Sequence, residues 1–119
     1  MNIVIYGNID ERETLCSVIE SHGALLFRRK QCIFYDNYDD FLREIQRRAP
    51  ELVIISTDGA NGMEGVIATR ELHPEVKIFW FSDDKALGTQ SYRLYCTYFA
   101  VKPITEQVLN RALAQISGR

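Results

Sequence analysis

The sequence lacks the patterns that mark the commonest small metal sites and enzyme active sites. Its three cysteines, Cys16, Cys32 and Cys96, include no C-x-x-C pair, and neither histidine, His22 or His73, has a partner at metal-ligand spacing. Neither a G-x-G-x-x-G loop nor a Walker loop is present, and no nucleophile elbow can be found. We therefore expect buried, reduced thiols, no metal, no cofactor and no enzymatic activity.

Strong net charge and long apolar runs are also absent. The chain has 14 basic and 16 acidic residues and a formal charge of −2, which argues against nucleic acid or an anionic membrane as its partner. No apolar run is long enough to span a membrane, and Met1 leads into a strand-like run without a signal-peptide pattern, so we expect a cytoplasmic protein. With 119 residues, 46% of them hydrophobic, residues 1–119 are expected to form one domain.

Five short apolar runs are typical of strands buried on both faces. They cover residues 3–6, 32–35, 52–55, 76–81 and 98–101. In the fourth run only Lys77 interrupts the apolar residues. Because helical patterns lie between these runs, the sequence predicts an α/β domain with a parallel, doubly wound sheet of five strands.

The helical segments are predicted from caps and from apolar residues at helical spacing. Asp10 with Glu13 forms a capping box, and Asn37 and Thr105 are predicted N-caps. The first helix is expected to end near Gly23 or one turn later, while 63–72 and the weaker 86–95 are further helices. The residues expected to face the sheet are Leu15, Val18, Ile19, His22, Tyr38, Phe41, Leu42, Ile45, Met63, Val66, Ile67, Leu72, Val108, Leu109, Ala112, Leu113 and Ile116.

Polar residues follow the strands at the edge where a sheet of this kind binds ligands, beside the point at which the winding direction reverses. They are Gly7, Asn8 and Asp10 after the first strand, Ser56, Thr57, Asp58 and Gly59 after the third, Ser82, Asp83 and Asp84 after the fourth, and Lys102 after the fifth.

Four segments, "PELVIIS", "MEG", "FWFSD" and "FAVKP", resemble landmarks of the receiver domain of bacterial response regulators, and the resemblance covers the whole chain. It implies a flavodoxin-like, three-layer α/β/α fold and a role in two-component signal transduction. Such receivers carry an acidic pair after the first strand, a phospho-accepting Asp after the third, a Ser or Thr after the fourth and Lys-Pro after the fifth. Ser82 matches the hydroxyl, and Lys102-Pro103 matches the Lys-Pro pair.

The acidic residues of this pattern are missing. Gly7 and Asn8 hold the positions of the acidic pair, and Ser56 or Thr57, depending on the direction of counting, holds that of the acceptor. Asp58 comes one or two places later. Because side chains alternate along a strand, a shift of one residue would normally point Asp58 away from the acceptor position. Mg²⁺ needs anionic oxygens as ligands, and the hydroxyl of a serine or threonine needs a general base before it can accept a phosphoryl group. The sequence therefore predicts an atypical receiver that acts without metal or phosphorylation.

Lys102 would then lie in a pocket that has lost its usual acids. A buried ammonium needs a partner, and those within reach are Asp58, Asp10, Asp83 and the Thr57 hydroxyl. We expect a polar lock in which Lys102, with Ser82 and Ser56 or Thr57, holds this edge in one state. Alternatively, Lys102 only caps a carbonyl or points to water.

An aromatic cluster marks the fourth helix and fifth strand. Phe99 matches the signalling aromatic of receivers, and Tyr95 stands where a glycine usually ends the helix. Tyr92, Tyr95 and Tyr98 are candidates for an interface with a protein partner or a second copy, formed by the fourth helix, fifth strand and fifth helix. The alternative is that these rings fill the core.

Two other functions stay open at this stage. The chain could be a conventional Mg²⁺-dependent receiver that uses Asp58 through a bulge in the 56–62 turn. It could also be a flavodoxin-like cofactor carrier, although "YGNIDERE" offers a phosphate only Asn8 and backbone amides. Because the last predicted helix ends the sequence, the chain is also expected to be the N-terminal part of a longer regulator.

Overall fold

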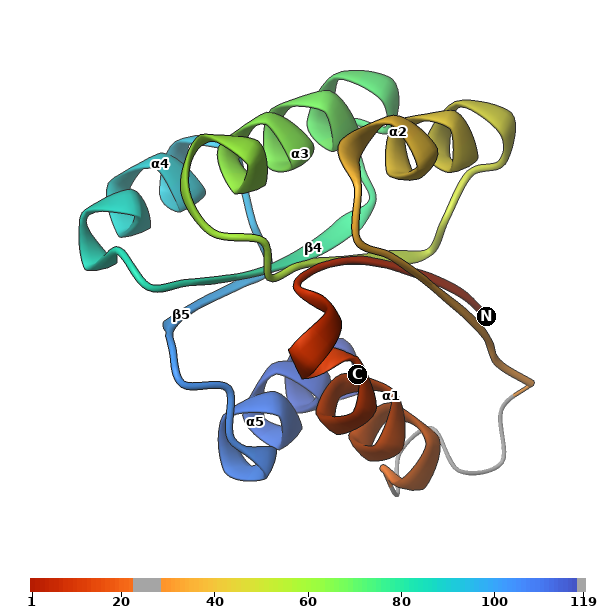
Figure 1. Ribbon diagram of the computed structural model, residues 1–119, viewed down its shortest axis with the longest axis vertical. Helices are drawn as coiled ribbons and strands as arrows, with labels where there is room; N and C mark the ends of the chain where they lie inside the picture. The colour runs from red at the N-terminus through yellow and green to blue at the C-terminus, as the bar shows by residue number, and fades with distance from the viewer. Residues whose placement is uncertain (23–28, 118–119) are drawn as a thin grey trace.

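Five parallel strands form one sheet in the order β2-β1-β3-β4-β5 in the computed structural model, which describes residues 1–22 and 29–117 (Figure 1). The strands are β1 Asn2–Tyr6, β2 Gln31–Tyr35, β3 Leu52–Ile55, β4 Lys77–Ser82 and β5 Tyr98–Val101. The order reverses beside β1, so the doubly wound parallel sheet predicted from the sequence is confirmed.

Helices cover both faces of the sheet, which gives three layers. They are α1 Arg12–Ser21, α2 Tyr38–Arg47, α3 Gly59–Leu72, α4 Gly88–Arg93 and α5 Glu106–Ser117, with 3-10 turns η1 Ile9–Glu11 and η3 Lys85–Leu87. Figure 1 shows α1 and α5 on one face and α2, α3 and α4 on the other. None of the helices in the described ranges is long and apolar enough to cross a membrane. The helix α1 ends at Ser21, followed by an extended His22, close to the predicted end near Gly23 and not a turn later.

The strands contribute side chains alternately to two cores. In β4, Phe79 and Phe81 pack under α1 and α5, while Ile78 and Trp80 pack under α2 and α3. All four residues of β3 are fully buried. Burial on both faces is the physical reason for the continuous apolar runs, and it supplies the main driving force for this fold.

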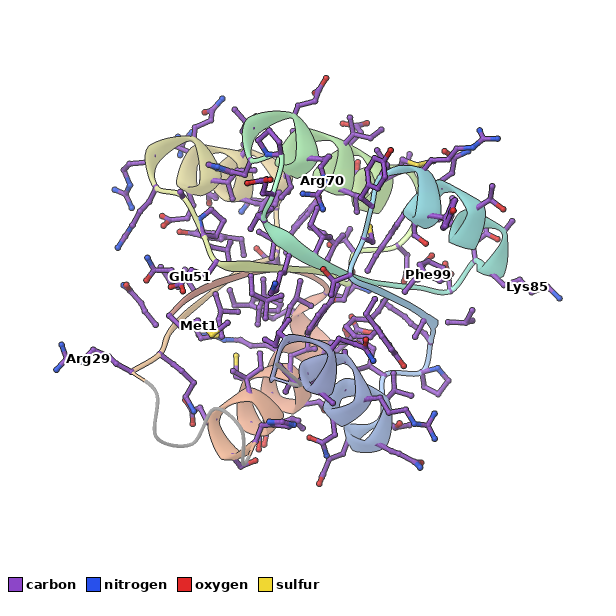
Figure 2. The ribbon with its side chains drawn as sticks, turned by 180° about the vertical axis from the view of Figure 1, so that it is seen from behind. Met1, Arg29, Glu51, Arg70, Lys85 and Phe99 are labelled. Carbon is purple, nitrogen blue, oxygen red and sulfur yellow. The ribbon has the colours of Figure 1, made fainter. Side chains whose placement is uncertain are left out.

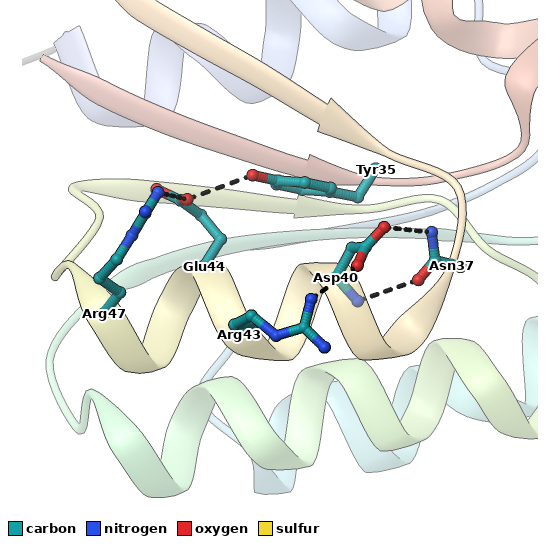
Figure 3. A network of polar contacts seen from close by, with 6 residues as sticks. All are labelled: Tyr35, Asn37, Asp40, Arg43, Glu44 and Arg47. Carbon is teal, nitrogen blue, oxygen red and sulfur yellow. Dashed lines mark hydrogen bonds and ion pairs between the residues drawn. The ribbon is translucent and has the colours of Figure 1, made fainter.

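Two helix caps that the sequence predicts are present in the structure. The Asn37 side chain accepts a hydrogen bond from the Asp40 amide at 2.9 Å, and the Thr105 hydroxyl accepts one from the Val108 amide at 3.1 Å. Figure 3 shows that α2 is also tied to β2 through Glu44, which is buried and pairs with Arg47 while accepting from the Tyr35 hydroxyl. The periodicity of the helix did not predict this buried acid.

The start of the first helix differs from the prediction. The predicted capping box of Asp10 and Glu13 is wrong, because the 3-10 turn η1 comes first and Glu11 holds the N-cap position without a side-chain bond. Asp10 therefore lies inside η1, ahead of the helix that it was expected to cap.

The sheet-facing stripe of α3 also differs from the prediction. This helix begins at Gly59, four residues before the predicted start, and Ile67 and Leu72 are exposed rather than inward. Its buried stripe includes Gly62 and Gly65. A Cβ at Gly65 would lie only 3.0 Å from the Tyr6 ring, so the sheet excludes larger side chains there.

Arg70 joins three segments on the α3 side of the sheet (Figure 2). Its guanidinium donates to the carbonyls of His73, Pro74 and Val76, which lead from α3 into β4, at 2.8 to 3.2 Å. It also donates to the carbonyls of Leu94 and Tyr95 after α4, at 2.9 and 3.1 Å. This one side chain therefore fixes the end of α4, which stops at Arg93 rather than at the predicted residue 95.

Candidate functional site

Polar side chains converge where β1, β3, β4 and β5 end. These strands are neighbours in the sheet, so the segments 7–11, 56–59, 82–84 and 102–103 lie at one edge. This is the edge at which the sequence placed its candidate residues, although not all of them contact one another.

Lys102 lies at the centre of this edge. Its Nζ atom is 2.9 Å from Glu11 Oε2 and 3.1 Å from Asp58 Oδ1, and it also donates to the Ser56 carbonyl. Only 12% of its side chain is exposed, against 19% for Glu11 and 37% for Asp58. We call Lys102, Glu11, Asp58 and the Ser56 carbonyl the Lys102 cluster. It holds two carboxylates and one ammonium, so its formal charge is −1.

Asp58 points into the edge, contrary to the expectation that its place in the sequence would turn it away. β3 ends at Ile55, so strand alternation no longer governs residue 58. Asp58 holds the N-cap position of α3, and Gly59 follows with φ +70°, a conformation that favours glycine. The carboxylate also accepts from Asn8 Nδ2 and from the Asp83 amide, each at 3.3 Å.

Glu11 is the functional residue that sequence reasoning missed. Asp10 was the expected partner of Lys102 from this segment, because it follows the first strand more closely. The 3-10 turn η1 changes which side chain faces the edge, and it brings Glu11 against Lys102. The only signal for this in the sequence is a second acid next to Asp10, which does not identify the correct one.

The hydroxyl groups do not form the predicted lock. Ser82 Oγ accepts from the Asp84 amide at 3.1 Å, and Lys102 binds the carbonyl of Ser56 rather than its hydroxyl. The Thr57 hydroxyl is buried beside the Tyr6 phenol. Of the expected partners of Lys102, the structure pairs it with Asp58 and not with Asp10, Asp83 or the Thr57 hydroxyl, and it adds Glu11.

Ser56 and Gly7 lie against each other inside this edge. Ser56 Oγ is fully buried and has no hydrogen-bond partner among residues 1–22 and 29–117. A Cβ at Gly7 would lie 2.1 Å from that oxygen, whereas its next neighbours would lie at 3.5 Å. A side chain at position 7 therefore requires the Ser56 hydroxyl to move.

Gly7→Ala is expected to lower the free energy of unfolding by about 2 kcal/mol, because its Cβ overlaps Ser56 Oγ. Ser56→Ala is expected to be nearly neutral, since it removes a buried hydroxyl that has no partner. The double variant should recover most of the loss, and urea unfolding of all four proteins gives the coupling. Additive effects of the two substitutions would contradict this packing.

The predicted aromatic cluster is divided between the two faces of the sheet. Phe99 packs edge-on against Trp80, with ring centroids 5.6 Å apart, on the α4 face. Tyr98 points to the other face and packs against Phe79 and Phe81 of the core, so it does not join the other tyrosines.

Tyr92 and Tyr95 lie on the surface at the end of α4. They are 84% and 80% exposed, and Tyr95 has the left-handed φ of 57°, as its place at a glycine-type helix end suggested. Two large exposed rings on one short segment are more typical of a contact surface than of a core.

The Lys102–Pro103 peptide is cis.

The loop after β1 offers few free amides to a phosphate group, because the Gly7 amide already donates to the Tyr35 carbonyl at 3.0 Å and the Glu11 amide donates to the Asn8 carbonyl at 2.9 Å. This arrangement does not favour the cofactor-carrier alternative.

Neither models of protein families nor curated protein sequences match this chain. Solved structures do. The response regulatory domain of protein mrkE from Klebsiella pneumoniae matches with a TM-score of 0.80 at 15% identity, over 99% of this chain and 96% of that one. The REC domain of AraT, a response regulator from Geobacillus stearothermophilus, matches with a TM-score of 0.79 at 16% identity, over 98% and 92%. A LuxR-family DNA-binding response regulator from Staphylococcus aureus gives 0.74 at 18% identity, over 98% of both chains. The chain therefore has the flavodoxin-like α/β fold of response regulator receiver domains.

Proposed function

We propose that this chain is a receiver-type regulatory module of two-component signalling and that it acts without phosphorylation of an aspartate. The observation that carries the proposal is the Lys102 cluster, in which one ammonium lies within 3.1 Å of both Glu11 and Asp58. Gly7 and Asn8, at the positions of the acidic pair, add no further carboxylate.

The two carboxylates of the Lys102 cluster are already paired with an ammonium, which disfavours the metal that receiver chemistry uses. Mg²⁺ takes oxygen ligands in near-ideal octahedral geometry and gives up its waters reluctantly. Among residues 1–22 and 29–117 no group of three or more His, Cys, Asp or Glu side chains could hold a metal ion. The two carboxylates of the cluster already share Lys102, so a divalent ion would have to displace it. Without the ion, charge on a transferring phosphoryl group is not neutralised.

A specific observation favours a second candidate, a conventional receiver phosphorylated on Asp58. Its carboxylate points into the edge, contacts Lys102 and accepts from the Asp83 amide. A carboxylate in that place is a ready nucleophile toward a phosphoryl group. This candidate still requires a metal, and it therefore makes the opposite prediction about phospho-donors.

Incubation with acetyl phosphate and Mg²⁺ is expected to leave the intact mass of the protein unchanged, because no metal-bound acceptor site forms. The measurement is intact mass spectrometry, with a receiver that has a complete acidic pair as the positive control for the donor. A phosphoryl adduct that disappears in Asp58→Asn would establish the second candidate instead.

The proposed output surface is the end of α4 with Tyr92 and Tyr95, which would contact a protein partner or a second copy of the chain. Replacing both residues by Ala is expected to weaken self-association or partner binding at least tenfold, since aromatic anchors dominate such interfaces. Ile67→Ala, an exposed apolar position on α3, is the matched control. If sedimentation and binding assays give the same result for the double variant and the control, this surface is not the output.

A further inference from the structure

Cys16 of α1 and Cys32 of β2 lie on elements that face each other. Together with Cys96 they are free and only partly buried, which corrects the expectation of fully buried thiols. Both Cys16 and Cys32 pack against the core cluster under α1 and α5. They come from opposite sides of residues 23–28, so the fold rather than sequence spacing brings them together.

The register between α1 and β2 is fixed by contacts on either side of the two cysteines. Toward the start of α1, the Arg12 guanidinium lies over the Phe34 ring, 5.8 Å from its centroid. Toward the end of α1, Lys30 Nζ donates to the carbonyls of Ile19 and Glu20, at 3.3 and 3.0 Å. The helix therefore runs antiparallel to the strand, from Phe34 back toward Lys30.

Between these contacts the register brings Cys16 opposite Cys32. Cys16 is one turn beyond Arg12, a rise of about 6 Å. Cys32 is two residues before Phe34 on the same face of the strand, a distance of about 6.6 Å. Burial, together with the neighbouring Cys16 thiol, raises the pKa of the Cys32 thiol to about 12. The two sulfur atoms are therefore neighbours.

The structure assigns Cys16 and Cys32 as a site of reversible oxidation to an intramolecular disulfide by a hydroperoxide. Cys16 lines an open groove with Arg12, Ser17 and Glu20, so the oxidant reaches it first. The Cys16 sulfur attacks the peroxide, the O–O bond breaks, and a sulfenic acid and one hydroxyl leaving group form. The leaving group takes the thiol proton and leaves as water or, for an alkyl hydroperoxide, as the alcohol.

Cys32 then completes the reaction as the resolving thiol. Its sulfur attacks the Cys16 sulfur, the S–O bond breaks, and the hydroxyl leaves with the Cys32 proton as a second water. With hydrogen peroxide, two thiols and one oxidant give one disulfide and two waters. The resulting bond would tie α1 to β2, one of the two edge strands of the sheet. A thiol reductant restores both cysteines, which makes the site reversible.

The test treats the purified full chain with hydrogen peroxide, alkylates the remaining thiols and maps the peptides after tryptic digestion without reduction. Cleavage at Arg28, Arg29 and Lys30 separates the two cysteines into peptides 13–28 and 31–43. The expected product is these two peptides joined and lighter by two hydrogen atoms than their sum. It should come from a species that is monomeric on a non-reducing gel.

Cys96→Ser is the matched control and should give the same joined peptides, whereas Cys16→Ser and Cys32→Ser should each abolish them. Because the wild-type map alone identifies the linkage, the test does not depend on how well those variants fold. Four results would overturn the assignment: unmodified thiols, Cys16 oxidised further without a linked peptide, a linkage through Cys96, or a linkage between two chains.

Discussion

Replacing Arg70 by Met is expected to lower the free energy of unfolding by about 3 kcal/mol. The guanidinium donates to five backbone carbonyls in the turn after α3 and at the end of α4, and no apolar side chain can satisfy them. Buried acceptors that lose their donor cost about 1–3 kcal/mol each, although water will reach some of these. Urea unfolding followed by circular dichroism measures the loss.

Two further variants separate the geometry of this contact from its charge. Arg70→Lys keeps the charge but has a single ammonium, so it should recover less than half of the lost stability. Arg93→Met removes a neighbouring exposed guanidinium on α4 and should stay within about 0.5 kcal/mol of wild type. If Arg70→Met were as stable as Arg93→Met, the five hydrogen bonds would not position the end of α4 as described.

Replacing Lys102 by Met is expected to lower the free energy of unfolding at neutral pH by about 2 kcal/mol. The change leaves the Glu11 and Asp58 carboxylates close together without a cation, in a place where Glu11 is largely shielded from water and Asp58 is partly shielded. Replacing Glu11 by Gln in the same chain removes the repulsion, so the double variant should recover part of the lost stability. Thermal unfolding of wild type and both variants is the measurement.

Lys85→Met provides the control for the loss of one positive charge, because Lys85 is exposed at the start of η3 (Figure 2). It should change stability by less than about 0.5 kcal/mol. If Glu11→Gln recovers nothing in the Lys102→Met background, that variant acts through lost packing rather than through the two carboxylates.

The sheet could be predicted from the sequence because the central strands β1, β3 and β4 are buried on both faces. A run such as Leu52–Ile55 has few alternatives once helical patterns flank it. The helix faces were harder to predict. In α3 several residues against the sheet are small. At position 65 only glycine fits, because the Tyr6 ring occupies the space that a side chain would need. Hydrophobic spacing instead suggested Ile67 and Leu72, which are exposed.

The position of the site in the fold could be predicted from the sequence, but its side-chain contacts could not. Strand ends place Lys102 and the residues after β3 at one edge, and this needs no side-chain geometry. The choice between Asp10 and Glu11 depends on a single 3-10 turn, and the direction of Asp58 depends on the left-handed φ of Gly59. Such local conformations are set by contacts between distant segments, which no residue pattern in one chain contains.

The central claim is that the ammonium of Lys102, and not a metal ion, satisfies the carboxylates at this edge. A titration of the ¹⁵N-labelled protein with MgCl₂, followed by the amide shifts of Asn8, Glu11 and Asp58, tests it most directly. We expect only small, non-saturating shifts up to millimolar Mg²⁺. Saturable shifts confined to these amides would show a bound metal ion and would contradict it.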